Sequence, residues 1–221
     1  MSPPVTEPAG GAATAPGRAY AYDDPRPAHS HAYLRSHIAR AIDAGTWSVP
    51  ARALDYGCGN GSLTGWLAGK GFAAVGVDIS ESGIEVARKA FPAAVFSTDV
   101  SAENLARLGP FDLVLCSEVI AHCYVPSAEL KKIFDCLRPG GRLVLTTPYH
   151  GYLKNLVLAV TGRLEGHLDT LWSGSYVHFF TVASITRLLA QAGFADIAVV
   201  RAGRVRYLAK SMVVTCTKPI R

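Results

Sequence analysis

The sequence has few of the features that would place a protein in a membrane or on a nucleic acid. No apolar run approaches the length that a bilayer span requires. Lysine and arginine are not interleaved with aromatic residues in the manner of single-strand binders, although the net charge is +5. The N-terminal residues lack the basic stretch and apolar stretch of a secretory signal. We therefore expect no integral membrane association, no nucleic-acid partner and a cytoplasmic protein.

Paired cysteines are also absent. The five cysteines are an odd number and show no short paired spacing, which argues against a disulfide framework and against a zinc cluster. The densest basic cluster contains Arg201, Arg204 and Arg206. We interpret it as a solvated strand end in preference to a contact with an anionic substrate or partner.

The 221 residues are 49% hydrophobic, which predicts one globular domain with a full core. Residues 1–28 hold most of the proline and glycine breakers, and such a segment buries too little apolar surface to offset its ordering entropy. We expect 1–28 to be a mobile tail and 29–221 to be the domain. Apolar residues at helical spacing predict a helix from about 29 to 44, lying over the mouth of a ligand site.

From residue 52 onward, short apolar runs alternate with amphipathic ones. This pattern predicts a parallel sheet with helices on both faces. The expected strands are 52–56, 73–78, 93–97, 111–116, 142–147, 195–201 and 207–216. The expected helices are 62–70, 81–90, 101–107, 127–137 and 182–192, with caps at Ser62, Ser80, Ser101 and Ser127.

A glycine-rich turn follows the first of these strands. Gly57, Gly59 and Gly61 occupy alternate positions, where glycine permits positive φ and close approach of a ligand. A dinucleotide site would have its third glycine one residue later, over a pyrophosphate. Here Asp55 precedes the loop, and a carboxylate suits a cationic ligand better. Asp78 ends the second strand, where an acidic residue can accept from two ribose hydroxyls.

These motifs together resemble those of class I S-adenosylmethionine-dependent methyltransferases. The matching segments are Leu54–Gly61, Val75–Ser80, Phe111–Val119 and Leu137–Leu145. The resemblance implies an α/β, Rossmann-like three-layer sandwich with a seven-stranded, mostly parallel sheet and an antiparallel C-terminal hairpin strand. It also implies a helical lid insertion after strand five, at about residues 149–180.

The resemblance further implies how S-adenosylmethionine is held. The loop of Gly57, Gly59 and Gly61 would pass under its methionine and ribose, and Asp55 would attract its cationic end. Asp78 would bind the ribose and Ile79 would pack on adenine. Asp99, with its neighbour Val100, would accept from the adenine amine, although Asp99 could instead cap the helix beginning near Ser101. Ser117 would face the methionine through its backbone.

The segment Ser117–His122 resembles the Glu-x-x-Glu-His stretch of ubiquinone-pathway O-methyltransferases, which is associated there with a divalent metal. Ala121 replaces the second glutamate, so Glu118 and His122 are weak metal candidates and we expect no metal. An imidazole titrates near neutral pH, which makes His122 the favoured general base. His150 and His178, in the insertion, are the other candidates for the base or a substrate donor.

Together these features predict methyl transfer from S-adenosylmethionine to a small-molecule hydroxyl or phenol in a biosynthetic pathway. A small-molecule N-methyltransferase is the nearest alternative. An NAD-dependent oxidoreductase and a non-catalytic nucleotide-binding module are rivals from other classes. The apolar stretch 152–160 could form a homodimer contact as easily as a lid.

Overall fold

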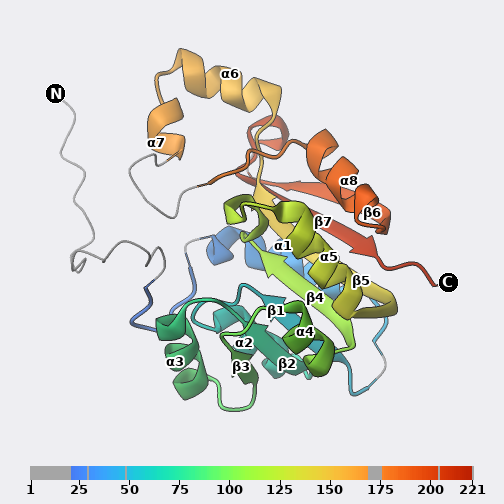
Figure 1. Ribbon diagram of the computed structural model, residues 1–221. Helices are drawn as coiled ribbons and strands as arrows, with labels where there is room; N and C mark the ends of the chain where they lie inside the picture. Colours follow the sequence, from blue (N-terminus) through green and yellow to red (C-terminus); the bar gives the residue numbers. More distant parts are fainter. Residues whose placement is uncertain (1–20, 29, 48, 169–175, 204, 221) are drawn as a thin grey trace.

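The computed structural model describes residues 21–28, 30–47, 49–168, 176–203 and 205–220. One seven-stranded sheet has the order β3-β2-β1-β4-β5-β7-β6. All neighbouring strands are parallel except for β7, which is antiparallel to both β5 and β6. The predicted sheet and its antiparallel hairpin strand are therefore confirmed, and Figure 1 shows helices on both of its faces.

The strands lie close to their predicted positions. They are β1 (Arg52–Tyr56), β2 (Ala73–Val77), β3 (Val95–Ser97), β4 (Phe111–Ser117), β5 (Leu137–Pro148), β6 (Ala195–Ala202) and β7 (Ser211–Thr217). Two strand starts differ from the prediction by more than two residues. Strand β5 begins five residues earlier, and a 3₁₀ turn, η2 (Arg206–Leu208), stands where the last strand was expected to begin.

The helices are α1 (His31–Asp43), α2 (Ser62–Gly69), α3 (Glu81–Ala90), α4 (Ala102–Leu108), α5 (Pro126–Cys136), α6 (Tyr152–Val160), α7 (Leu164–Leu168) and α8 (Val182–Gln191). The side chains of Ser80 and Ser101 cap α3 and α4, as predicted. The caps predicted at Ser62 and Ser127 are wrong. Helix α2 is capped by Gly61 in a left-handed conformation, and α5 begins with Pro126, whose fixed φ suits the first helical position.

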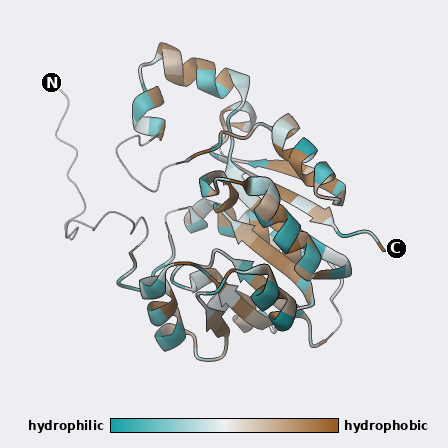
Figure 2. Ribbon diagram, in the orientation of Figure 1, coloured by the Kyte–Doolittle hydropathy of each residue, from teal (hydrophilic) through white to brown (hydrophobic). Residues whose placement is uncertain are grey.

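Alternate residues of each strand point to opposite faces and fill two cores. Val114 and Cys116 of β4 join the core beneath α4, α5 and α8, whereas Leu113 and Leu115 join the core beneath α1 and α2. Burial on both faces explains why β4 is apolar almost throughout. Figure 2 shows the central strands as hydrophobic and the outer helix surfaces as hydrophilic.

Helix α1 packs on the sheet through Leu34, Ile38 and Ile42, all fully buried. It therefore lies mainly over the sheet face instead of over the mouth of a site. Its first turn approaches that edge: His31 Nδ1 is 3.2 Å from Ser62 Oγ at the start of α2, and the Tyr33 hydroxyl is 2.9 Å from Ser211 Oγ, beside the end of β5.

The segment that precedes α1 contacts the glycine loop. Asn60 donates its side-chain amide to the carbonyls of Asp24 and Arg26, at 2.9 and 2.8 Å. The backbone N–H of Tyr22 donates to Ser82 Oγ at 3.1 Å. Residues 22–26 are therefore held against the fold. The predicted tail otherwise falls in residues 1–20, outside the described part, and its boundary stays a prediction.

The insertion after β5 forms α6 and α7, which stand above the carboxyl edge of the strands (Figure 1). Across the described ranges no helix is both long and apolar enough to cross a bilayer.

Candidate functional site

The glycine loop has a backbone that other residues would strain. Gly57, Gly59 and Gly61 have φ values of 76°, 53° and 78°. A Cβ added at Gly57 would lie 2.3 Å from a Val119 methyl group, and one at Gly59 would lie 2.6 Å from the Tyr22 hydroxyl. The structure thus brings the three predicted glycines into one closely packed turn between β1 and α2.

Asp78 lies beside that turn and orders it. One carboxylate oxygen accepts from the Gly59 N–H and the other from the Ser80 N–H, both at 2.8 Å. Burial raises the pKa of Asp78. A carboxylate has about four lone-pair sites, so Asp78 can also accept from a diol. Its neighbour Ile79 is 70% exposed, which leaves a large apolar side chain open at the same edge.

Asp55 lies in β1 beneath the loop and is 1% exposed. Its carboxylate accepts from Thr64 Oγ1 at 2.7 Å. Burial raises its pKa to about 7, and the nearby charge of Asp78 adds to the effect. A cation near a buried carboxyl of this kind lowers its pKa and so favours the charged form.

Asp99 bonds to the backbone at the start of α4, close to the helix-capping role that was predicted as the alternative to adenine binding. Its Oδ1 accepts from the Ser101 N–H at 2.9 Å, in front of α4, and interactions with the Ser101 hydroxyl and N–H lower the pKa of Asp99. Its carbonyl accepts from the Asn104 side chain at 2.6 Å. Asp99 is exposed and Val100 is half-buried. Contact of either residue with adenine stays a prediction.

Ser117 and Glu118 end β4 at the same edge. Ser117 Oγ lies 3.1 Å from Thr146 Oγ1, which donates to the Glu118 carboxylate at 2.9 Å. Glu118 has φ of 58°, a left-handed conformation that is uncommon outside glycine and often marks a functional position. Burial raises the pKa of Glu118 to about 7.

His122 and His178 lie on facing segments. His122 ends the 3₁₀ turn η1 (Ile120–His122), half-buried, with its ring 4.8 Å from that of Tyr176. The backbone N–H of His178 donates to the Ala121 carbonyl at 3.0 Å, which joins the end of the lid to η1. The ring of His178 stacks on Phe180, with centroids 5.8 Å apart.

His150 lies beneath the lid and is 3% exposed. Its ring centroid is 4.9 Å from that of Phe179 and 5.6 Å from that of His167. Burial lowers its pKa to about 4, and the charge of Lys154 contributes. His150 is therefore neutral at physiological pH, and its imidazole is too weakly basic to be an efficient proton acceptor there.

Three further functional candidates were not identified from the sequence. Lys154 is 6% exposed, whereas a lysine usually buries its stem alone and keeps its ammonium group in water. Tyr33 bonds to Ser211 at 2.9 Å across 178 positions of sequence, which no local pattern reveals. Tyr22 approaches Gly59 from a segment whose proline content signalled only a tail.

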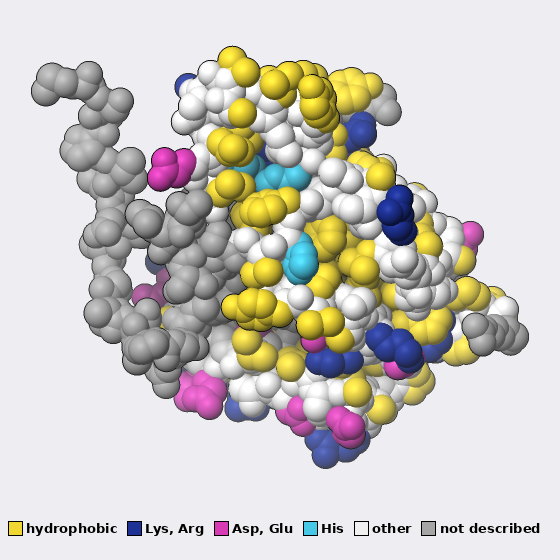
Figure 3. All heavy atoms as spheres, turned by 45° about the horizontal axis from the view of Figure 1, so that its top comes forward, with side chains coloured by type: hydrophobic (Ala, Val, Ile, Leu, Met, Phe, Trp, Pro, Cys, Tyr) yellow, Lys and Arg dark blue, Asp and Glu magenta, His cyan; other side chains and the backbone are white. Residues whose placement is uncertain are grey.

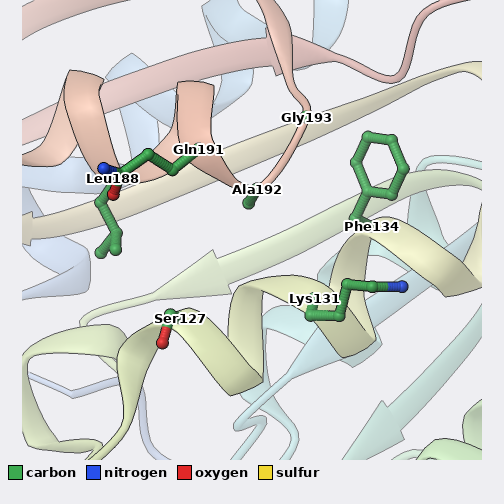
Figure 4. Close-up of a pocket in the computed structure, with 7 residues that line it drawn as sticks. All are labelled: Ser127, Lys131, Phe134, Leu188, Gln191, Ala192 and Gly193. Carbon is green, nitrogen blue, oxygen red and sulfur yellow. The ribbon is translucent and has the colours of Figure 1, made fainter.

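The pocket drawn in Figure 4 lies elsewhere. It has a volume of about 290 Å³ between α5 and α8, and its lining includes Lys131, Phe134 and Gln191. None of the predicted site residues lines it.

The described residues bring together no group of three His, Cys, Asp or Glu side chains that could hold a metal ion. Glu118 and His122 have the protein contacts given above. The expectation that no metal takes part stays a prediction.

Comparison with known proteins agrees with this geometry. The chain is 33% identical over 161 residues to the ubiquinone biosynthesis O-methyltransferase of Thiobacillus denitrificans, covering 70% of this chain and 68% of that one. It resembles the magnesium protoporphyrin IX methyltransferase of Synechocystis, solved with bound S-adenosylhomocysteine, with a TM-score of 0.62 at 24% identity over 86% and 83% of the two chains. It also resembles the [4+2]-cyclase SpnF, with a TM-score of 0.66 at 17% identity over 91% and 87%.

The two structural likenesses establish the fold, and the cyclase shows that this fold also serves other chemistry. The family is identified by sequence similarity. The profile of the methyltransferase domain family matches residues 22–199, and that range begins with the segment that contacts the glycine loop. The chain belongs to this family and is a class I S-adenosylmethionine-dependent methyltransferase.

Proposed function

We propose that this enzyme methylates a hydroxyl or phenol oxygen of a small molecule in a biosynthetic pathway. The observation that supports an oxygen acceptor is the 33% identity to a ubiquinone biosynthesis O-methyltransferase. The chain has Glu118 and His122 where the ubiquinone-pathway motif has its first glutamate and its histidine, and it has Ala121 in place of the second glutamate. This pattern is consistent with the same class of acceptor, activated by a general base without a metal ion.

The cofactor would be held by the edge formed after β1, β2 and β3. S-adenosylmethionine, when bound, supplies an activated methyl group. The glycine loop permits close approach, and Asp55 favours a cation at that end. Asp78 would accept from the ribose hydroxyls, Ile79 would cover adenine, and Asp99 with Val100 would border its far edge. Ser117 would face the methionine.

On the acceptor side, His122 is the favoured general base. It lies on η1 directly after β4, and its ring packs against Tyr176, so both segments can border one acceptor. A positioned imidazole that accepts the hydroxyl proton typically contributes 10²- to 10⁴-fold to rate. His178 is the second candidate because its backbone is bonded to the same turn. His150, neutral and buried, suits hydrogen bonding to the acceptor.

The enzyme's remaining task is alignment and exclusion of water, for which oriented approach can supply roughly 7–11 kcal/mol. The lid helices α6 and α7, above the strand ends, are placed for this task (Figure 1).

The test is transfer of labelled methyl from S-adenosylmethionine to matched phenols, carboxylates, amines and thiols, with and without EDTA. We expect label on a phenol or alcohol oxygen, unaffected by EDTA. Labelling of amines alone would overturn the oxygen acceptor in favour of N-methylation. Loss of labelling in EDTA, restored by Mg²⁺, would overturn the metal-free mechanism. The Asp78→Ala variant is the control for cofactor-dependent transfer.

A further inference from the structure

Unpartnered polar atoms gather beneath the lid. Within the described ranges, five buried side-chain atoms have no hydrogen-bond partner: Thr147 Oγ1, His150 Nε2, Asn155 Oδ1, His167 Nε2 and Arg201 Nε. The first four come from the end of β5 and from the lid helices, and Arg201 lies over the ring of Tyr149 at 5.2 Å. Burying a polar atom without a hydrogen-bond partner costs free energy, so their concentration here indicates that a ligand supplies the missing partners.

Lys154 gives this cluster its charge. Its ammonium donates to the carbonyls of Tyr149 and Lys210, at 2.7 and 3.3 Å. An ammonium has three N–H groups, so one is left for another acceptor. In the part of the chain that the structure describes, no carboxylate forms an ion pair with Lys154. Burial lowers its pKa to about 8, so most of it is charged at neutral pH.

The surrounding charges favour an anion over a cation. Lys154 acts on both His150 and His167 and lowers the pKa of each, although burial is the larger cause. Glu118 is the acidic group that acts on Lys154, and Lys210 opposes it. The ammonium of Lys154 would repel a metal ion, whereas its remaining N–H and the N–H groups of the two neutral imidazoles can donate to an oxyanion.

We propose that Lys154, His150 and His167 form a recognition site for a carboxylate carried by the methyl acceptor. This inference rests on the proposed function, because the site borders the acceptor side of the sheet edge. The charge of Glu118 acts on Lys154, and Glu118 bonds to Thr146 beside Ser117. A carboxylate bound there lies next to the reacting edge and fixes the orientation of the acceptor. Figure 3 shows histidine side chains in and beside the hollow beneath the lid.

Specificity for charge tests the site. Methyl transfer would be measured for hydroxybenzoates and for the corresponding hydroxybenzamides, which have the same size without the charge. We expect wild-type enzyme to prefer each acid over its amide by about 10- to 100-fold in kcat/KM, as a bond to a charged group predicts. The difference should lie mainly in KM. Lys154→Met should reduce the preference to within about threefold of unity.

Lys131→Met is the matched control, because Lys131 is an exposed lysine of α5 that pairs with Asp135, away from the lid. It should keep the wild-type preference. Since Lys154 also ties α6 to the sheet, His167→Gln on α7 provides a second variant that leaves the bonds of Lys154 in place, and it should lower the preference several-fold. A purely structural role for Lys154 would lower turnover of acid and amide alike.

Binding separates failure of this site from failure of the proposed function. Benzoate and benzamide carry no hydroxyl, so calorimetry with S-adenosylhomocysteine present reads the site without any transfer. Tighter binding of benzoate that is lost in Lys154→Met supports the site whatever atom is methylated. Equal affinities together with equal kcat/KM for acids and amides, or a preference that survives in both variants, overturn it.

Discussion

The two halves of the sheet edge differ in how their buried polar groups are satisfied. In the half that we propose binds the cofactor, formed after β1 to β3 and called the cofactor half, the carboxylates of Asp55 and Asp78 accept from neighbouring protein groups. In the acceptor half, formed after β4 and β5 with the lid, Thr147 and His150 keep buried polar atoms without partners. The buried polar groups of the cofactor half are hydrogen-bonded without a ligand, whereas some of those in the acceptor half are not.

This difference matches what each half has to recognise. A cofactor common to the whole family is served by a rigid turn, whereas an acceptor peculiar to one enzyme is served by groups that the ligand itself satisfies. The lid also exposes Tyr152, Leu153 and Leu156, which indicates that its packing against the rest of the chain is light.

Turnover and cofactor binding should respond separately if the two halves act separately. We expect His122→Asn to lower kcat by about 100-fold or more, the usual range for a general base, while the Kd of S-adenosylmethionine stays within about twofold. Single-turnover methyl transfer and calorimetry measure the two quantities. His37→Asn, on α1 with its ring bonded to Arg40, is the control. Wild-type turnover in His122→Asn would transfer the role to His178.

Two glycines of similar backbone conformation allow a direct comparison of packing. Gly61 in the cofactor loop and Gly162 in the lid have φ of 78° and 66°. A Cβ at Gly61 would lie 2.6 Å from Ala87 Cβ, whereas one at Gly162 would have nothing within 4 Å. We expect Gly162→Ala to reduce the free energy of unfolding by about 1 kcal/mol through strain alone, and Gly61→Ala by about 3 kcal/mol because overpacking is added.

Urea unfolding of both variants measures these losses. Equal losses would mean that the loop relaxes around the added methyl group, and the contrast in rigidity between the halves would be rejected.

The cofactor half is also the half that the sequence predicts well. Its loop, acidic residues and caps at Ser80 and Ser101 are local signals, each readable within a few positions. The β/α alternation likewise predicts the mostly parallel sheet with helices on both faces. Misplacing the start of α5 at Ser127 was a local error, since Pro126 is itself a good first helical residue.

The acceptor half depends on contacts between distant segments. Whether Lys154 is buried depends on where the carbonyls of Tyr149 and Lys210 meet α6, and the sequence of an apolar helix does not reveal this. The same holds for the bond of Tyr33 to Ser211. Sequence therefore named the candidate histidines without showing that His150 would be buried and neutral.

Two aspartates of the cofactor half should differ in their importance for binding. Asp78→Ala removes a half-buried carboxylate that orders the loop, and we expect it to weaken S-adenosylmethionine binding by about 2 kcal/mol, roughly 30-fold. Asp99→Ala removes an exposed carboxylate, and a change of less than about fivefold is expected. Calorimetry measures both, with thermal unfolding as the check on folding. Equal losses would show that Asp99 binds adenine as strongly as Asp78 binds ribose.

The two halves should also show opposite pH dependences of stability. Asp55 has a folded pKa of about 7 against an ordinary value of 3.8, so the folded state binds more protons between them and Asp55 lowers stability as pH rises from about 4 to 7. His150 has a folded pKa of about 4 against 6.5, so the unfolded state binds more protons and stability rises from about pH 4 to 6.5.

Thermal unfolding of Asp55→Asn and His150→Gln from pH 4 to 7.5 measures the two contributions as differences from wild type. With increasing pH, Asp55→Asn should gain stability relative to wild type, and His150→Gln should lose it. Curves parallel to wild type would show that the carboxyl of Asp55 and the imidazole of His150 titrate in the folded protein as they do in the unfolded chain. Both groups would then be more hydrated than their burial implies, and the contrast between a completed cofactor half and an uncompleted acceptor half would lose its electrostatic basis.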